Sequence, residues 1–209
     1  MRRNSFRFPC VLFCVALILT SCALFENAPE IVPDAAMRSR LATLKHWRMD
    51  GRVGVRRADE SWHAGLIWNH EPDTDRLYLS GPFGQGALNI KVTRHSIRVA
   101  SADGTVEESD DPARMLESLI GVAVPVSALR YWILGLSYPD AECGCEYDRS
   151  GRLKKLNQLG WVTEYQDYQT VEQWSVPKKL SVENASTRLK LVIDEWRFRD
   201  ANITTQAGS

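Results

Sequence analysis

Apolar and polar residues alternate with a period of two over most of the chain from Trp47 onward. In the first such stretch Met49 and Val53 stand among the odd positions, and Asp50 and Arg52 stand among the even ones. Successive side chains of a strand point to opposite faces of a sheet, so this alternation predicts strands with one buried and one solvated face. The chain is therefore predicted to fold mainly as antiparallel β-sheet.

The same alternation predicts about ten to eleven strands in one sheet. After the strand that begins at Trp47, the candidate stretches are 62–68, 77–79, 88–92, 97–99, 142–147, 153–158, 161–165, 179–183 and 189–198. Asp103 and Gly104 form a pair that hairpin turns favour. A single antiparallel sheet of this width must curl toward a barrel, and we expect an incomplete, half-open one.

Three helices are predicted beside the strands. The first is expected from Asp34 onward, where apolar residues recur at helical spacing. Its apolar stripe consists of Met37, Leu41 and Leu44. The second follows the acidic pair 110–111, either of which can cap a helix that starts at Pro112. The third is expected between Pro125 and Gly135, and together the helices would form a lid or plug against the sheet.

A sheet this wide, with only three short helices, is expected to leave a hydrophobic cavity on its concave face. Eleven inward-facing residues are its predicted acyl-chain lining: Met49, Val53, Leu66, Trp68, Leu77, Leu79, Leu88, Ile90, Leu189, Leu191 and Ile193. The alternative is a fully packed interior, because alternating apolar residues mark any half-buried sheet. The seven tryptophans fit either interpretation.

The N-terminus has the layout of a secretory signal peptide, with arginines at positions 2 and 3 before the apolar run 11–19. That run is shorter than the ~20 apolar residues of a spanning helix, which argues against a permanent transmembrane anchor. It ends in Leu19-Thr20-Ser21-Cys22, which resembles the lipobox of bacterial lipoproteins. The resemblance implies cleavage before Cys22 and lipidation of its thiol. Ala23, in place of Asp, resembles an outer-membrane address.

This layout divides the chain into four segments: a cleaved signal peptide (1–21), a lipidated N-terminus and linker (22–35), one folded domain (36–200) and a disordered tail (201–209). Loss of the signal peptide leaves 23 basic and 26 acidic residues, a net charge of −3. That mildly acidic balance argues against nucleic acid as a partner. We expect a monomer.

The chain lacks the short motifs of several common enzyme classes. It contains no G-x-S-x-G, no H-E-x-x-H, no P-loop and no G-x-G-x-x-G, so we expect no enzyme, no catalytic residue and no cofactor. The histidines form no cluster with metal-ligand spacing, so no metal site is expected. They are His46, His63, His70 and His95. The acidic run 107–111 is expected in a turn that leads into a helix.

Cys143 and Cys145 are the two cysteines that remain once the signal peptide leaves and Cys22 is lipidated. A disulfide across Cys-Gly-Cys would close a very tight ring against the usual Cα spacing and would be strained if it formed. We therefore interpret the pair as a feature of a hairpin tip without catalytic consequence.

The segment Gly81-Pro82-Phe83-Gly84 places a large aromatic side chain at a hairpin tip, where residues are normally solvated. Phe83 either folds back under the helices or protrudes. A protruding Phe83 resembles a membrane-touching wedge, worth about 2 kcal/mol of partition free energy, which suits transient insertion.

The ordered set of motifs resembles the outer-membrane lipoprotein receptor LolB family over roughly residues 41–198. Beside the lipobox, the motifs are Gly51-Arg52, 62–68, 81–84, Pro125-Val126, Leu129-Arg130-Tyr131-Trp132-Ile133-Leu134-Gly135, Gly160-Trp161, Val176-Pro177 and 189–196. The resemblance implies an incomplete antiparallel barrel with a helical lid around a hydrophobic cavity. It gives the folded domain a lipoprotein-binding role.

The resemblance also implies a function. A protein held at the periplasmic face of the outer membrane through Cys22 would receive acylated lipoproteins from the soluble carrier LolA, a structural relative, and insert them into the outer membrane without a nucleotide. Its partners would be a LolA-type carrier, the acylated cargo and outer-membrane lipid. Phe83 aligns with a protruding apolar residue that is usually Leu in the family. The alternative is a protein-assembly or scaffold module with a packed barrel and no lipid ligand.

Overall fold

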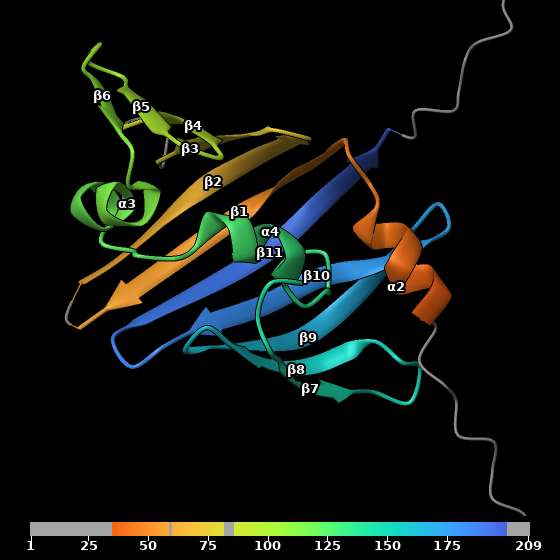
Figure 1. The fold of residues 1–209 in the computed structure, drawn as a ribbon. Coiled ribbons are helices and arrows are strands. Elements are labelled where there is room, and N and C mark those ends of the chain that lie inside the picture. Colours follow the sequence, from red (N-terminus) through yellow and green to blue (C-terminus); the bar gives the residue numbers. More distant parts are fainter. Residues whose placement is uncertain (1–34, 59, 82–85, 200–209) are drawn as a thin grey trace, which may run out of the picture. The chain divides into compact units, whose positions relative to one another are not determined.

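The computed structural model describes residues 35–58, 60–81 and 86–199, which form eleven strands and three helices (Figure 1). The strands are β1 (Trp47–Arg57), β2 (Glu60–Glu71), β3 (Thr74–Ser80), β4 (Leu88–Thr93), β5 (Ile97–Ser101), β6 (Val106–Ser109), β7 (Gly144–Tyr147), β8 (Leu153–Gln158), β9 (Trp161–Val171), β10 (Trp174–Glu183) and β11 (Thr187–Phe198). The helices are α2 (Ala35–Ala42), α3 (Pro112–Ile120) and α4 (Val126–Trp132). The signal peptide, Cys22, Phe83 and the tail 201–209 lie outside the described residues, and what was expected of them stays a prediction.

All eleven strands join one antiparallel sheet in the order β6-β5-β4-β3-β2-β1-β11-β10-β9-β8-β7. The first and last strands of the chain, β1 and β11, lie side by side in its middle, and each half of the sheet is a meander. The edge strands β6 and β7 do not pair with each other, so the sheet stays open. The predicted mainly β fold with a half-open sheet is confirmed.

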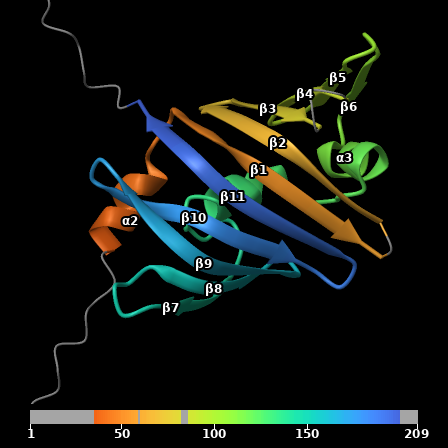
Figure 2. The ribbon, with the colours of Figure 1, turned by 180° about the vertical axis from the view of Figure 1, so that it is seen from behind.

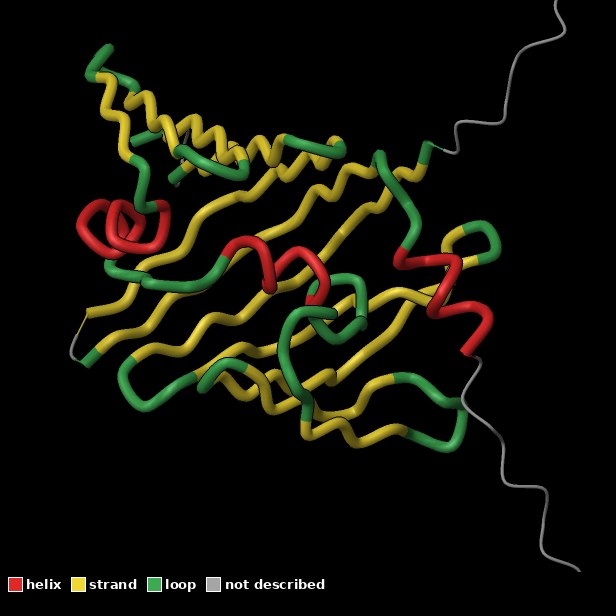
Figure 3. Tube along the Cα trace, viewed as in Figure 1, coloured by secondary structure: helices red, strands yellow, loops and turns green. Residues whose placement is uncertain are grey.

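The segment between β6 and β7 passes from one edge of the sheet to the other, because these two strands are the edges. It carries α3 and α4, and the two opposite views agree that α4 lies over one face of the sheet (Figures 1 and 2). The tube in Figure 3 shows this segment as two helices separated by a loop. We call residues 110–143 the crossing segment.

The register places the alternating apolar residues on the same face as α4. Met49 of β1 lies opposite Trp68 on β2 and Trp196 on β11, and all three are buried. Polar neighbours such as Arg52 point to the other face, where Arg52 forms a salt bridge with Asp194 of β11. The period of two therefore decides which side chains enter the core.

Gly51 lies where the pairing of β1 with β11 shifts by one residue. A Cβ atom on Gly51 would lie 2.4 Å from the carbonyl oxygen of Val192, a distance at which backbone would have to move. Only glycine allows this close approach at a bulge. This is a physical reason for glycine in the Gly51-Arg52 motif.

Two boundaries differ from the sequence prediction. The acidic run is not a turn: residues 106–109 form the edge strand β6, where Glu108 pairs with Arg98 of β5. This cross-strand ion pair offsets the weak strand preference of the acidic residues. Strand β10 begins at Trp174 rather than at Lys179, because its first residues extend the pairing with β9.

The expectation that the two cysteines lie at a hairpin tip is wrong. Cys143 and Cys145 form a disulfide with a Cα–Cα distance of 5.5 Å, which lies within the usual range. They also lie at the start of the edge strand β7, where the crossing segment rejoins the sheet, rather than at a hairpin tip.

Candidate functional site

The eleven residues predicted to line a cavity lie together on the sheet face that α4 covers, which we call the inner face. Cross-strand pairs connect them: Leu66 lies opposite Leu79, and Leu77 lies opposite both Trp68 and Ile90. Nine of the eleven are buried, and Leu77 and Leu88 are partly buried against the same cluster. Their common position is what the alternation predicts, while their role in holding acyl chains stays a prediction.

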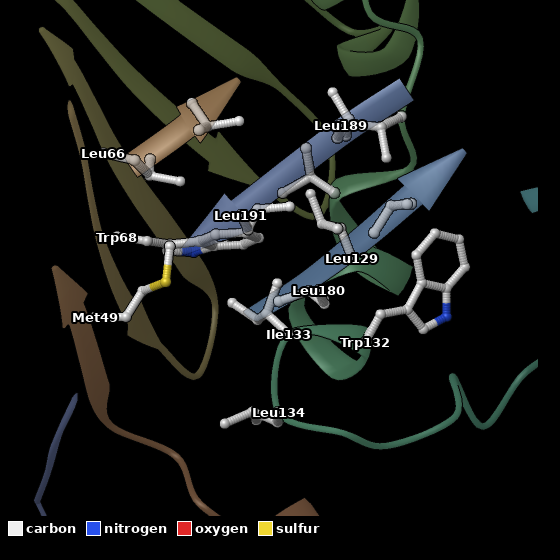
Figure 4. Packing of buried hydrophobic residues seen from close by; sticks show 14 of the residues in the cluster. Met49, Leu66, Trp68, Leu129, Trp132, Ile133, Leu134, Leu180, Leu189 and Leu191 are labelled. Atoms are coloured by element: carbon white, nitrogen blue, oxygen red, sulfur yellow. The ribbon is translucent and has the colours of Figure 1, made fainter. Parts of the chain in front are cut away.

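Apolar side chains from α4 and the turn after it cover the inner face (Figure 4). Figure 4 shows Leu129 and Ile133 together with Leu180 of β10 and Leu191 of β11 among the buried side chains. All four belong to one cluster of buried residues, in which Ile133 and Leu180 have no exposed surface. A ligand on the inner face would therefore lie between the sheet and α4.

Asp75 is a buried carboxylate at the margin of this apolar cluster, with 4% of its surface exposed. Its Oδ1 atom accepts a hydrogen bond from Trp68 Nε1 at 2.9 Å and lies 2.8 Å from His70 Nδ1. Its Oδ2 atom lies 3.4 Å from the guanidinium of Arg130 on α4. Asp75 thus links α4 to β2 and β3, which satisfies the requirement that a buried charge be paired.

Gln158 at the end of β8 holds the other end of α4. Its Oε1 atom accepts hydrogen bonds from Trp132 Nε1 and from the Tyr138 backbone N–H, both at 2.9 Å. Its Nε2 atom donates to the carbonyl oxygens of Tyr138 and Ala141 at 2.8 and 2.7 Å. Four hydrogen bonds from one amide fix the helix end and the loop that follows it to the sheet.

Two tyrosines of β9 add further bonds beside Gln158. Tyr165 donates its hydroxyl to the carbonyl oxygen of Trp132 at 2.9 Å, and Tyr168 donates to that of Leu153 at 2.7 Å. Burial raises the pKa of both hydroxyls, so both remain protonated donors at neutral pH. Gly135 has a φ of +76°. A Cβ atom added to it would lie 3.2 Å from the hydroxyl oxygen of Tyr168, which leaves little room for a side chain.

A pocket of about 600 Å³ opens between the start of α3, α4 and the turns that follow β2 and β4. Its lining includes the charged residues Asp75 and Arg130 and the apolar residues Val92, Val124 and Val126. The three valines belong to the buried cluster. This pocket therefore connects solvent with the margin of the inner face.

Asp75 and Gln158 were not predicted as functional positions from the sequence, although a signal was present. Each stands at an inward position of its strand: Asp75 precedes Leu77 by two residues, and Gln158 follows Leu156 by two. A polar residue in register with an apolar stripe predicts a buried side chain that needs partners. Arg130 and all the partners of Gln158 come from the crossing segment, and no period in the sequence places that segment.

The described residues contain no group of three or more His, Cys, Asp or Glu side chains that could hold a metal ion. Over the same ranges, no helix has the length and apolar character needed to cross a membrane.

The sequence of this chain is similar to that of a known family of bacterial lipoproteins. The sequence model of the family described as "Outer membrane lipoprotein LolB" matches residues 45–196, well over half of the chain. The outer-membrane lipoprotein LolB of Marinomonas sp. (strain MWYL1) is 30% identical over 196 residues, which cover 93% of this chain and 100% of the relative. That of Chromohalobacter salexigens is 33% identical over 185 residues, with coverages of 87% and 86%.

Among solved structures, the crystal structure of the LolA superfamily protein NE2245 from Nitrosomonas europaea superposes with a TM-score of 0.48 at 9% identity, covering 76% of this chain and 88% of that one. The matched segments cover 100% and 86% of the two relatives' own lengths. The family match runs from just before β1 to Trp196 of β11. The chain therefore belongs to the LolB family of outer-membrane lipoproteins.

Proposed function

We propose that this protein accepts acylated lipoproteins from a soluble LolA-type carrier and inserts them into the outer membrane, with the acyl chains held on the inner face. Cys22 would carry the lipid that keeps the protein at the periplasmic side of that membrane. The transfer needs no nucleotide if each apolar site along the route binds the chains better than the one before.

The observation that carries this proposal is the extent of the inner face. It is a continuous apolar surface on an open sheet, and it is covered by helices of the crossing segment rather than by a second sheet. Burial of one methylene group contributes about 0.8 kcal/mol, so a long acyl chain can offset the loss of packing contacts with α4. An open sheet can admit such a chain where a closed, filled barrel cannot.

The 600 Å³ pocket beside Asp75 and Arg130 supplies a route to that face. Its lining combines buried valines with the charged side chains of Asp75 and Arg130. We place the entry of the acyl chains here, with the polar part of the lipoprotein remaining toward solvent.

The test uses the mature chain with Cys22→Ala, mixed with carrier that holds an acylated lipoprotein, and follows the cargo by pull-down. Leu66→Asn places a polar group on the inner face, and Ile67→Asn places the same group on the opposite face of β2. We expect Leu66→Asn to lower uptake about tenfold, because an unpaired buried amide costs about 1–3 kcal/mol. Ile67→Asn should leave uptake unchanged.

Thermal unfolding of both variants shows whether each remains folded. Equal uptake by the two variants would contradict an acyl-chain site on the inner face. If the cargo stays on the carrier, and a fluorescent fatty-acyl probe also fails to bind the wild-type protein, the scaffold function replaces the acceptor function.

The delivery step is proposed for Phe83 from the sequence alone, since this residue lies outside the described ranges. Phe83→Glu should leave uptake from the carrier nearly intact and slow the transfer of cargo to lipid vesicles, because a carboxylate does not enter the apolar layer. A collapse of uptake in this variant would contradict the separation of the two steps.

A further inference from the structure

The disulfide between Cys143 and Cys145 lies at the edge strand β7, which β8, β9 and β10 separate from β11, the nearest strand of the predicted acyl-chain lining. The proposed lipid transfer assigns it no role. It closes a loop of only three residues where the crossing segment joins β7. Cys143 is exposed, whereas Cys145 is half-buried and packs against the core cluster next to Leu156. The two sulfur atoms therefore differ in their access to solvent.

A three-residue loop gives a disulfide little of its usual stabilising effect. Cross-linking lowers the entropy of the unfolded chain by an amount that grows with the logarithm of the loop length, so this loop lies at the bottom of the scale. Gln158 and Tyr165 already fix the end of α4 to the sheet without it. The disulfide therefore adds little to the stability of the fold. Exposed disulfides exchange with thiols more readily than buried structural ones.

The position on an edge strand adds a means of recognition. β7 pairs with β8 on one side and has no strand partner on the other among the described residues. A free strand edge binds extended polypeptide by main-chain hydrogen bonds. Cys143 immediately precedes β7, so a segment paired along β7 would pass close to this cysteine.

We propose that the Cys143–Cys145 disulfide is a thiol–disulfide exchange site for extended polypeptide segments that carry two cysteine thiols. A thiolate of the segment attacks Cys143 Sγ, the Sγ–Sγ bond breaks, and its electron pair stays on Cys145 Sγ, which takes up a proton. The second thiolate of the segment then attacks the sulfur joined to Cys143 and releases the Cys143 thiolate, which is protonated in turn. The segment gains a disulfide and loses two protons and two electrons, and this chain gains two thiols.

The first measurement asks whether the bond exchanges at all. The mature chain with Cys22→Ala contains only these two cysteines, since Cys10 and Cys14 leave with the signal peptide. It is equilibrated with mixtures of reduced and oxidised glutathione together with ribonuclease A, whose disulfides are structural, and free thiols are counted by alkylation and mass spectrometry. We expect reduction of Cys143–Cys145 at least about tenfold faster than that of the ribonuclease. Equal resistance to reduction overturns the proposal.

The second measurement asks whether polypeptide is the substrate. A dithiol peptide of strand-forming sequence is mixed with the oxidised protein, and a matched peptide carries prolines that prevent pairing with β7. We expect about one peptide disulfide per chain, formed several-fold faster with the strand-forming peptide. Equal rates for the two peptides would overturn recognition by the edge strand, and no peptide disulfide would overturn the exchange activity.

Single-cysteine variants locate the reacting sulfur. Cys145→Ser leaves Cys143 free to form a mixed disulfide with a peptide activated as a thionitrobenzoate, and Cys143→Ser leaves the half-buried Cys145. As a matched control, Leu159→Cys in a background without the other cysteines offers a thiol that is also exposed but not on an edge strand. We expect Cys143 to react several-fold faster than either. A rate no higher than that of the control would contradict a built site.

Lipoprotein uptake in the variant lacking both cysteines separates this inference from the proposed function. We expect uptake from the carrier to equal that of the wild type, because β8, β9 and β10 separate the disulfide from the strands that carry the predicted acyl-chain lining. A loss of uptake would mean that the bond serves lipid transfer, which overturns an independent exchange site.

Discussion

The two helices of the crossing segment, α3 and α4, are held in opposite ways. α3 carries its own signals at both ends: Asp111 Oδ1 accepts a hydrogen bond from the Arg114 backbone N–H at 3.1 Å, and Gly121 closes the helix with φ +72°. Only Met115 and Leu116 of this helix are buried, however. α3 is thus well capped and poorly packed.

α4 shows the reverse. Pro125 at its N-terminus provides no side-chain capping hydrogen bond, but four of its seven residues are buried. Gln158 and Tyr165 bind its Trp132, and Asp75 pairs with its Arg130. Local sequence signals therefore hold α3, whereas contacts with the sheet hold α4. If the inner face opens to admit acyl chains, α3 has the smaller number of contacts to lose.

Among the variants that test how α4 is held, Gln158→Leu is expected to have the largest effect on stability. The change removes all four amide hydrogen bonds and leaves Trp132 Nε1 and the polar backbone atoms of Tyr138 and Ala141 without a partner. We expect a loss of about 3–4 kcal/mol in the free energy of unfolding, measured by urea denaturation. Gln166→Leu on the exposed side of β9 serves as the control and should change the free energy of unfolding by less than about 1 kcal/mol. Similar losses in both variants would mean that α4 does not depend on this anchor.

The next effect is expected at Asp75. Asp75→Leu leaves Trp68 Nε1 and the His70 ring without their acceptor, while Arg130, whose side chain is 25% exposed, can turn toward water. We expect a loss of about 2–3 kcal/mol in the free energy of unfolding. Asp73→Leu, in the exposed turn before β3, is the matched control and should have little effect. An unchanged stability would show that the carboxylate contributes no more than the apolar packing that replaces it.

A smaller change tests the local signal of α3. Asp111→Ala removes the capping hydrogen bond and should cost about 1 kcal/mol, visible as faster amide hydrogen exchange in residues 113–117. Asp110→Ala changes the neighbouring exposed carboxylate, which does not cap the helix, and should leave exchange unaffected. If α3 exchanges as slowly as α4 in the wild type, packing holds both helices and the proposed difference is wrong.

The same contrast explains what could be predicted from the sequence. Capping of α3 by one residue of the acidic pair 110–111 and the turn at Gly135 were predictable, because these signals act within a few residues. The inward position of Met49, Leu66 and Leu191 was predictable too, since a period of two decides the face of a strand. The partners of Gln158, and Arg130 as a partner of Asp75, were not, because they come from the crossing segment, whose position on the sheet no local pattern specifies.

The smallest expected effect comes from a polar group that, unlike Gln158, has found no partner. Thr163 of β9 lies on the inner face between Leu156 and Val182, with 1% of its surface exposed. Its hydroxyl makes no hydrogen bond to another described residue, so the protein bears its desolvation cost without compensation. Thr163→Val replaces this hydroxyl by a methyl group of nearly the same size and should raise the free energy of unfolding by about 1 kcal/mol.

Thr170→Val, at an exposed position of the same strand, is the control for strand propensity, because it makes the same exchange in contact with water. We expect it to stay within about 0.5 kcal/mol of the wild type. A stability loss in Thr163→Val alone would show that the hydroxyl is satisfied, most simply by a buried water, and that the inner face is wetter than its apolar lining indicates. Such a result would favour a hydrated cavity that acyl chains fill by displacing water, whereas a gain favours a dry face that opens only when α3 and α4 give way.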